Sequence, residues 1–383
     1  MITIIKKNTY DSVVEKILFA VYFVHQFTFV FSASQMSRSI ESLNRFLNII
    51  MILTFAVIIL CDFYYFLRGN FSLKEIIIYI LITIPLLISF MHYRVVMVIA
   101  NVFAISCFKN VNLKKILKIY LIATIMACIL NFLLSIFTKY TFNEETTRYG
   151  AFRIRYGLGF YWVTFFAHYF YSIVFMYILY KNKLNNIDYI VIMIINILLF
   201  IANDTKAVFI FTIVILIIEF ILNRKYNDIL YNIFGIVTSL SFIIGGLLSF
   251  LLSYFFDRSN EIMLFFNKIL SGRLDLMHRG LEKWGFTLWG QTIPIKETGN
   301  TIDSSMVSML MQNGLAVYVI CIGFMTIFSY LAYKNKKISL LIALFAIAIR
   351  STFDLGFMAL QFGPAVILFY TVLSSKNKSN ELL

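Results

Sequence analysis

Charged residues and proline are scarce in this chain. Only 14 % of its 383 residues are charged and three are proline, whereas 61 % are hydrophobic. This composition excludes a soluble fold, because a water-exposed surface needs many more charged side chains. Four cysteines fall in apolar stretches, without the spacing of a disulfide framework or a metal site, and are interpreted as packing residues. They are Cys61, Cys107, Cys128 and Cys321.

The chain also lacks a glycine-rich nucleotide loop, a Walker motif and an acidic metal cluster. These absences argue against a nucleotide-sugar enzyme and an ATP-driven pump, so neither a cofactor nor a metal is expected. The histidines show no metal-ligand spacing. The net charge of +14 is spread over short segments and forms no single basic face, so nucleic acid is not an expected partner.

What the chain does contain is a series of apolar stretches, most of them about as long as the roughly 17–25 residues of a membrane-spanning helix. We predict an all-α polytopic integral membrane protein, in which residues 1–383 form a single membrane domain of about twelve transmembrane helices. Lys6 and Lys7 precede the first stretch without a small-residue cleavage site, which indicates an uncleaved first helix. The predicted spans are 16–34, 46–66, 75–91, 93–108, 116–137, 161–180, 187–202, 206–222, 229–253, 305–333, 338–350 and 357–374.

Lysine and arginine are distributed differently among the loops. Most lysines fall in short loops on one side, which is typical of the cytoplasmic side, and with twelve spans both termini lie there. All arginines except Arg68 and Arg224 fall in segments assigned to the outer side. Arginine outside runs against this bias, and its planar guanidinium binds phosphate or carboxylate through two parallel hydrogen bonds. An anionic ligand outside the membrane is therefore the leading explanation.

Two outer segments, 138–160 and 254–304, are too long to be simple turns, and long loops in a compact body are often functional. In the second, apolar residues recur at intervals of three and four, which predicts a helix with one apolar face. We expect this helix to lie in the outer interface of the membrane. Its apolar positions are Leu270, Leu274, Met277, Leu281 and Trp284.

Arg273 lies in the first turn of this predicted helix, where Ser271 is a suitable N-cap. Free backbone N–H groups and a positive dipole end would favour an anion there. The residues three and four positions away from Arg273 are apolar and cannot neutralise it. Arg273 is therefore the first candidate for binding a phosphate, and snorkelling into the interface is the alternative.

His278 and Arg279 follow on the same predicted helix. Arg279 has Asp275 four residues before it and Glu282 three residues after it, which favours a solvated, salt-bridged face over ligand binding. His278 is a weaker candidate, as a general acid or base.

The segment 138–160 carries three arginines, of which Arg155 is followed by Gly157 and Gly159 and then by an aromatic run. Glycine allows close backbone approach to a ligand, and aromatic rings offer stacking surfaces for a sugar or an anchor in the interface. Arg155 has no obvious counter-charge and is interpreted as ligand-binding, with Arg153 as a secondary candidate. For Arg148, salt bridges to the nearby glutamates are favoured.

Charged residues at the outer ends of other spans are functional candidates by default. Asp303 precedes a span, and is either its N-cap or a carboxylate that accepts a proton. Lys206 follows Asp204 in an outer turn, and Arg350 precedes Asp354 by four residues. Each of these two pairs is either a structural ion pair or part of a site.

Three stretches combine with the topology to suggest a family. They are Arg155-Tyr156-Gly157-Leu158-Gly159-Phe160, then Ser271-Gly272-Arg273, then Asp303-Ser304-Ser305 with Gln312-Asn313-Gly314-Leu315. In these stretches, and in a large outer loop before the tenth span, the chain resembles the Wzy-type polysaccharide polymerases of the O-antigen ligase and polymerase family. It departs from the family at Thr205-Lys206, where members often have Ser-Arg. It also has Asp303 in a region where ligases often have histidine, which favours a polymerase.

The resemblance implies an enzyme of the bacterial cytoplasmic membrane that makes O-antigen, capsule or exopolysaccharide. Such enzymes join oligosaccharide repeat units carried on undecaprenyl pyrophosphate at the outer leaflet, without metal or nucleotide, beside a flippase and a chain-length regulator. A hydroxyl of one repeat attacks the anomeric carbon of the growing chain and displaces its lipid pyrophosphate. Arg273 and Arg155 are then expected to clamp the pyrophosphate and Asp303 to act as base or orienter. Arg153, Lys206 and Arg350 are expected in secondary roles.

Three alternatives stay open from the sequence. A ligase would transfer finished glycan to a different acceptor. A flippase or other transporter predicts charges spread through the spans around a central cavity, whereas the arginines here gather at one surface. A scaffold protein of the same pathway predicts no cavity that connects Arg155, Arg273 and Asp303.

Overall fold

The computed structural model describes residues 9–68, 112–148, 151–225, 227–270, 272–293 and 304–353, and scattered positions between 77 and 89. The helices are α1 (Thr9–Ser32), α2 (Gln35–Ser39), α3 (Glu41–Leu67), α6 (Leu113–Phe137), α7 (Phe165–Lys181), α8 (Asn186–Asn203), α9 (Lys206–Arg224), α10 (Asp228–Tyr254), α11 (Glu261–Ile269), α12 (Arg273–Trp284), α14 (Ser305–Asn313), α15 (Leu315–Lys334) and α16 (Ile338–Phe353). The strands are β1 (Asn143–Arg148) and β2 (Ala151–Tyr156).

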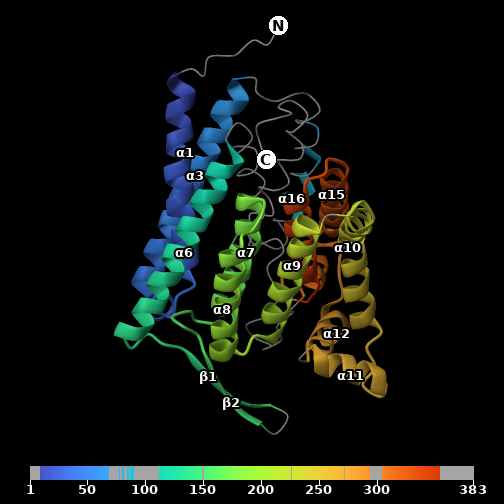
Figure 1. Cartoon of the computed structure of the whole chain (residues 1–383). Helices are drawn as coiled ribbons and strands as arrows, with labels where there is room; N and C mark the ends of the chain where they lie inside the picture. The colour runs from blue at the N-terminus through green and yellow to red at the C-terminus, as the bar shows by residue number, and fades with distance from the viewer. Residues whose placement is uncertain are drawn as a thin grey trace.

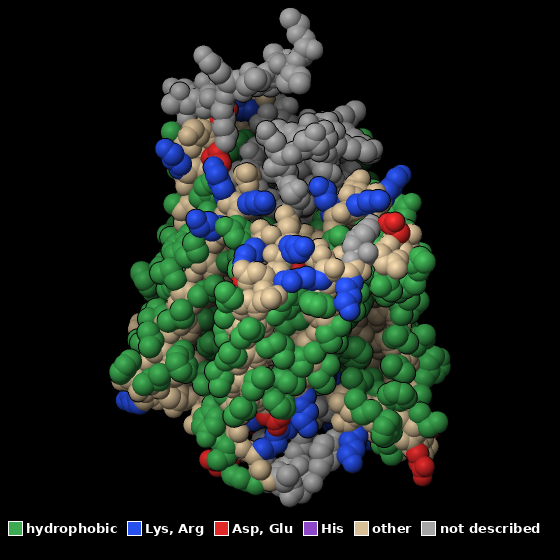
Figure 2. Space-filling model, in the orientation of Figure 1, with side chains coloured by type: hydrophobic (Ala, Val, Ile, Leu, Met, Phe, Trp, Pro, Cys, Tyr) green, Lys and Arg blue, Asp and Glu red, His purple; other side chains and the backbone are tan. Residues whose placement is uncertain are grey.

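The long helices run side by side along the body (Figure 1). Within the described residues, seven helices are long and apolar enough to cross a membrane: α1, α3, α6, α8, α9, α10 and α15. Helix α16 is apolar but shorter. On the face shown in Figure 2, hydrophobic side chains form a belt across the middle of the body, and basic side chains gather toward its two ends. The chain is therefore a helical membrane protein, as predicted.

The number of spans is not settled by these helices. The predicted spans 93–108 and 357–374 lie outside the described residues, and in 75–91 only scattered positions are described. The count of twelve therefore stays a prediction.

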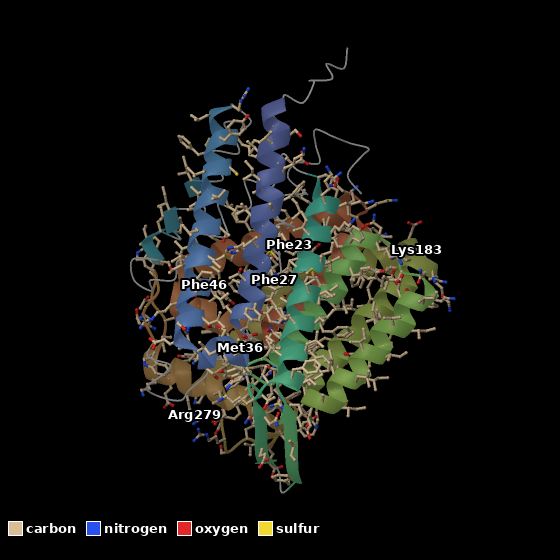
Figure 3. The ribbon with its side chains drawn as sticks, turned by 90° about the vertical axis from the view of Figure 1, so that its left-hand side faces the viewer. Phe23, Phe27, Met36, Phe46, Lys183 and Arg279 are labelled. Carbon is tan, nitrogen blue, oxygen red and sulfur yellow. The ribbon has the colours of Figure 1, made fainter. Side chains whose placement is uncertain are left out.

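The two ends of the body carry different residues. One end, called the hairpin end below, contains α2, the β1–β2 hairpin, α11, α12 and the turn between α8 and α9 (Figure 1). The opposite end contains the start of α6 and the turns after α7, α9 and α15. Figure 3 shows Arg279 at the hairpin end and Lys183 at the opposite end. The described arginines other than Arg68 and Arg224 belong to the hairpin end, so the arginine bias of the sequence is a spatial one.

Helices α7 and α16 form the centre of the core and bury most of their side chains. The hydroxyl of Tyr171 on α7 donates to the carbonyl oxygen of Ala346 on α16 at 2.9 Å. The hydroxyl of Ser249 on α10 donates to the carbonyl oxygen of Thr352 at 3.0 Å. Hydroxyl-to-carbonyl bonds inside an apolar body join helices that have no hydrophobic driving force to associate in lipid. They fix the part of α16 that lies nearest the hairpin end.

The prediction of one helix over 305–333 is wrong, because the chain breaks into α14 and α15 at Gly314. Gly314 has φ 91° and ψ 164°, a conformation that is essentially restricted to glycine. A Cβ atom there would lie 2.3 Å from the backbone nitrogen of Gly290. The N–H of Leu315 donates to the carbonyl oxygen of Thr287 at 2.9 Å. This hydrogen bond joins the large outer loop to the break between α14 and α15.

The outer segment 138–160 contains an antiparallel hairpin, so the prediction of an all-α fold is wrong there. Glu144 pairs with Arg155 and Thr146 with Arg153 in the strand register. Side chains alternate between the faces of a strand, so Arg153 and Arg155 share one face of β2. These strands were not predicted from the sequence, because β1 contains no apolar residue and so shows no apolar alternation.

The predicted apolar helix of 254–304 is present as α12, and a second helix, α11, precedes it. Leu274, Met277 and Leu281 of α12 are buried in a cluster with residues of α14 and of the α10–α11 link. The apolar face of α12 is thus used for packing within the protein. Helix α11 leaves five apolar residues exposed: Ile262, Leu264, Phe265, Phe266 and Ile269. Phe255, Phe286 and Leu288 are exposed elsewhere in the same loop.

Candidate functional site

Segments that the sequence marks as functional meet at the last described turn of α16. Arg273, at the start of α12, donates a hydrogen bond from Nη1 to the carbonyl oxygen of Phe353. Arg350 lies three residues earlier on α16. The hydroxyl of Ser304, the residue before α14, donates to the carbonyl oxygen of Ser351 at 3.4 Å. The starts of α12 and α14 therefore share one region of the hairpin end with Arg350.

Backbone geometry and Asn267 of α11 fix the start of α12. The N-cap is Gly272, with φ 85°, and not the predicted Ser271, which lies outside the described residues. The N–H of Gly272 donates to the Asn267 carbonyl oxygen at 2.7 Å, and the N–H of Asp275 donates to the Asn267 side-chain oxygen at 3.2 Å. These N–H groups are thus bonded within the protein, so the prediction that they are free for an anion is wrong. The positive group that this turn offers is the side chain of Arg273.

Arg350 is more deeply buried than the other candidate cations, with 5 % of its surface exposed. Its Nη1 donates to the hydroxyl oxygen of Ser172 on α7 at 3.1 Å. Ser172 in turn donates to the carbonyl oxygen of His168 at 3.0 Å. A guanidinium inside a membrane body is costly and marks a functional site by default. The predicted partner of Arg350, Asp354, lies outside the described residues.

His278 and Arg279 make contacts that account for them without a ligand. Nδ1 of His278 is 2.9 Å from the carbonyl oxygen of Ser253 at the end of α10, and its Nε2 is 3.9 Å from a Glu282 oxygen. Arg279 forms an ion pair with Asp275 at 2.9 Å, which confirms the predicted salt bridge. Both residues support α12 and through it the position of Arg273.

Arg153 and Arg155 form a second positive group, directed at the turn between α8 and α9. Arg155 donates from Nε to the carbonyl oxygen of Asn203 at 2.7 Å, and its Nη1 is 2.8 Å from an oxygen of Glu144. The expectation that Arg155 lacks a counter-charge is wrong, because strand pairing brings Glu144 opposite it. Burial lowers the pKa of the Arg155 guanidinium, and the charge of Glu144 opposes that shift. Arg153 forms an ion pair with Asp204.

Lys206 and Asp303 remain from the sequence candidates. Lys206 begins α9 with an exposed side chain, and its predicted partner Asp204 binds Arg153, so the Asp204–Lys206 pair is wrong. Asp303 lies outside the described residues. The N-cap of α14 is Ser304, so the alternative role of Asp303 as that cap is wrong.

Gly157 and Gly159 are accounted for by close contact with the protein's own backbone. A Cβ atom on Gly159, which has φ 88°, would lie 1.9 Å from the carbonyl oxygen of Asn131 on α6. A Cβ atom on Gly157 would lie 2.7 Å from the carbonyl oxygen of Phe142. The N–H of Gln35 donates to the carbonyl oxygen of Gly159 at 2.8 Å. The two glycines therefore allow the base of the hairpin to pack closely against α2 and α6. This packing explains them in place of the predicted close approach of a ligand.

The buried polar side chains of α14 were not predicted from the sequence. Every residue of this helix is buried, including Gln312 and Asn313, each 8 % exposed, directly before the break at Gly314. Broken helices with polar groups inside the protein are typical of membrane proteins that handle a polar ligand. The signal was the run Gln312-Asn313-Gly314 inside an otherwise apolar stretch.

This arrangement defines the class of the protein: a helical membrane protein whose arginines gather at one end, beside a broken helix. No family model matches the chain, and comparisons with curated proteins and with solved structures give no significant match.

Proposed function

We propose that this protein joins oligosaccharide repeat units carried on a polyprenyl pyrophosphate, as the Wzy-type polymerases that it resembles do. The observation that carries the proposal is that Arg273 and the start of α14 bind the last described turn of α16, the helix that carries Arg350. We assign the paired positive charge that a pyrophosphate needs to Arg273, which binds the carbonyl oxygen of Phe353, and to Arg350, three residues earlier on the same helix as Phe353.

In the proposed reaction, a hydroxyl oxygen of the acceptor repeat bonds to the anomeric carbon of the donor glycan. The bond from that carbon to the pyrophosphate oxygen breaks, the lipid pyrophosphate leaves with the electron pair, and the hydroxyl proton passes to a base. We assign Arg273 and Arg350 to the leaving pyrophosphate and Asp303 to the proton. Arg350 replaces Arg155 in the clamp, because Arg155 already binds Glu144 and Asn203. Stabilising the developing negative charge is the main catalytic contribution asked of the protein.

The proposal places the hairpin end outside the cytoplasmic membrane of a bacterium, with about twelve spans and both termini in the cytoplasm. Support comes from the lysine-rich turns of the opposite end, since cytoplasmic loops carry an excess of basic residues. Helix α11, with Phe265 and Phe266 exposed, then lies in the outer interface beside the polyprenyl chain of the substrate. A flippase and a chain-length regulator are the proposed partners.

Purified protein in lipid nanodiscs, supplied with a defined lipid-linked repeat unit, tests this function. Wild-type protein should give a ladder of products and release lipid pyrophosphate. Arg273→Ala should lower the rate by roughly 100-fold or more, the effect of removing one preorganised donor to a developing charge. Arg45→Ala is the matched control, because Arg45 lies at the same end, is exposed and pairs with Glu41. Near-normal polymerisation by both Arg273→Ala and Arg350→Ala would refute the clamp.

A transporter of an anionic lipid-linked glycan is the second candidate, favoured by the break between α14 and α15 and by the buried Arg350. Proteoliposomes with a fluorescent lipid-linked oligosaccharide separate the two functions. Movement of the lipid between leaflets without product growth identifies a transporter. Transfer of the glycan to a different acceptor, with no ladder, identifies a ligase.

A further inference from the structure

A cleft of about 360 Å³ opens between the start of α6 and the end of α7, at the end of the body opposite the hairpin. Lysines dominate its lining. The lining residues are Asn112, Lys114, Lys115, Lys118, Tyr180 and Lys181. The cleft contains none of the arginines of the candidate site, so the proposed polymerase function does not explain it.

Acidic side chains balance only part of the charge in the cleft. Lys115 Nζ is 3.4 Å from a Glu15 oxygen, and Lys181 Nζ is 2.6 Å from an Asp188 oxygen. Lys114 and Lys118 are exposed and form no ion pair within the described residues. The cleft therefore holds an excess of positive charge.

The start of α6 adds to this excess. The first turn of α6 contains no acidic residue, although the first turns of α8 and α10 each contain one. Lysines near the positive end of a helix dipole repel it. The cap of α6 is Asn112, whose side-chain oxygen accepts from the Lys114 N–H at 2.9 Å. The lysine ammonium groups are therefore the groups that are available to bind an anion.

An apolar stripe leads from the lysines into the hydrophobic belt. Residues three and four apart share one face of a helix, so Lys114 and Lys118 lie on the same face of α6 as Ile122, Ile125 and Ile129. These isoleucines are 42 %, 39 % and 51 % exposed. A molecule with an anionic head and a long apolar tail matches this order of groups. Sugar phosphates and nucleotides match only the lysines.

We propose that this lysine cleft binds the phosphate group of an anionic membrane lipid, whose acyl chain lies along the isoleucine stripe of α6. Basic clefts between helices at the cytoplasmic side suit such head groups, because ammonium groups attract phosphate at the membrane surface. The site is independent of the polymerase proposal, since it lies at the other end of the molecule. A soluble phosphate shares the chemistry of the head group, and the test below separates the two sources.

The test measures phosphatidylglycerol bound to the full-length protein by native mass spectrometry, after purification from nanodiscs of phosphatidylcholine and phosphatidylglycerol. Lys114→Ala/Lys118→Ala should weaken phosphatidylglycerol binding roughly 25-fold, from about fivefold for each lysine near an anionic surface. Lys114→Arg/Lys118→Arg should restore it. The matched control is Lys225→Ala/Lys334→Ala, which removes the same charge from exposed positions at the same end. It should weaken binding clearly less than Lys114→Ala/Lys118→Ala does, because neither control position lines the cleft.

A parallel titration with inorganic phosphate, read as a shift in thermal unfolding, identifies the source of the ligand. Stabilisation by phosphatidylglycerol alone assigns the cleft to lipid. Equal stabilisation by inorganic phosphate, lost in Lys114→Ala/Lys118→Ala, assigns the same lysines to a soluble phosphate. Undiminished lipid binding by that variant, or an equal loss in the control, would overturn the proposal.

Discussion

Arg273 of α12 donates a hydrogen bond to the carbonyl oxygen of Phe353 on α16, 80 positions further along the chain. This bond ties the large outer loop directly to a core helix that is itself fixed by hydrogen bonds from α7 and α10. A ligand held by Arg273 is therefore placed against a rigid element. Rigid placement within a fraction of an ångström is what a catalytic site requires.

The first prediction concerns the geometry of the Arg273 side chain. Arg273→Lys keeps the positive charge but removes the planar guanidinium that reaches Phe353 and that we propose binds two phosphate oxygens. We expect a loss of about tenfold in kcat/KM for the lipid-linked substrate, between wild type and Arg273→Ala. Steady-state release of lipid pyrophosphate measures it. Arg258→Ala is the control, since Arg258 lies in the same loop, is exposed and pairs with Asp275. A similar loss in the control would mean that the effect does not depend on the geometry of the Arg273 side chain.

The second prediction concerns the support of Arg350 by Ser172. Ser172→Ala removes the hydroxyl that accepts from the buried guanidinium and should destabilise the protein by about 1–3 kcal/mol. Ser329→Ala is the matched control, because the Ser329 hydroxyl is equally buried and donates only to Met325, one turn back on its own helix. Ser329→Ala should lower the free energy of unfolding clearly less than Ser172→Ala does. Thermal unfolding in one detergent compares the two, and equal effects would show that Ser172 does not hold Arg350.

These contacts mark the limit of what the sequence predicted. Apolar length predicted the spanning helices, and the interval of three and four predicted α12, because both patterns are local. The segregation of arginine also followed from sequence, since alternating helices bring every second loop to one end. Pairing across space did not follow: Glu144 meets Arg155 only because residues 143–156 fold back as a hairpin.

The break in the tenth predicted span illustrates a second limit. Hydropathy predicts 305–333 as one apolar stretch, because a single glycine hardly changes the mean hydropathy of so long a segment. The need for glycine there arises from Gly290, which contacts the break from the preceding loop. A tertiary contact of this kind leaves no periodic signal. The polar pair Gln312-Asn313 beside Gly314 is the one feature of the sequence that indicates a break in this helix.

The third prediction tests this break. Gly314→Ala should destabilise the protein by at least about 2 kcal/mol, because alanine is strained at φ 91° and its Cβ atom would clash with Gly290. Gly323→Ala is the control, a glycine within α15 where a Cβ atom meets nothing within 4 Å. That change should stay within about 1 kcal/mol of wild type or raise stability, since alanine favours helix. Unfolding in detergent decides between them, and a harmless Gly314→Ala would argue for a continuous helix.

The fourth prediction tests which side of the membrane the hairpin end faces. Glu282, at the hairpin end, has a side chain that is 73 % exposed, and Lys334 is exposed at the opposite end. In a variant whose Cys107 is replaced by serine, Glu282→Cys should react with a membrane-impermeant maleimide on intact cells. Lys334→Cys should react only after the cells are opened. The described native cysteines, Cys61, Cys128 and Cys321, are buried and should give little background. We expect this orientation from the lysine excess at the opposite end, because the cytoplasmic side retains basic loops. Labelling in the reverse order would place the arginines in the cytoplasm and remove the basis for an outer-leaflet substrate.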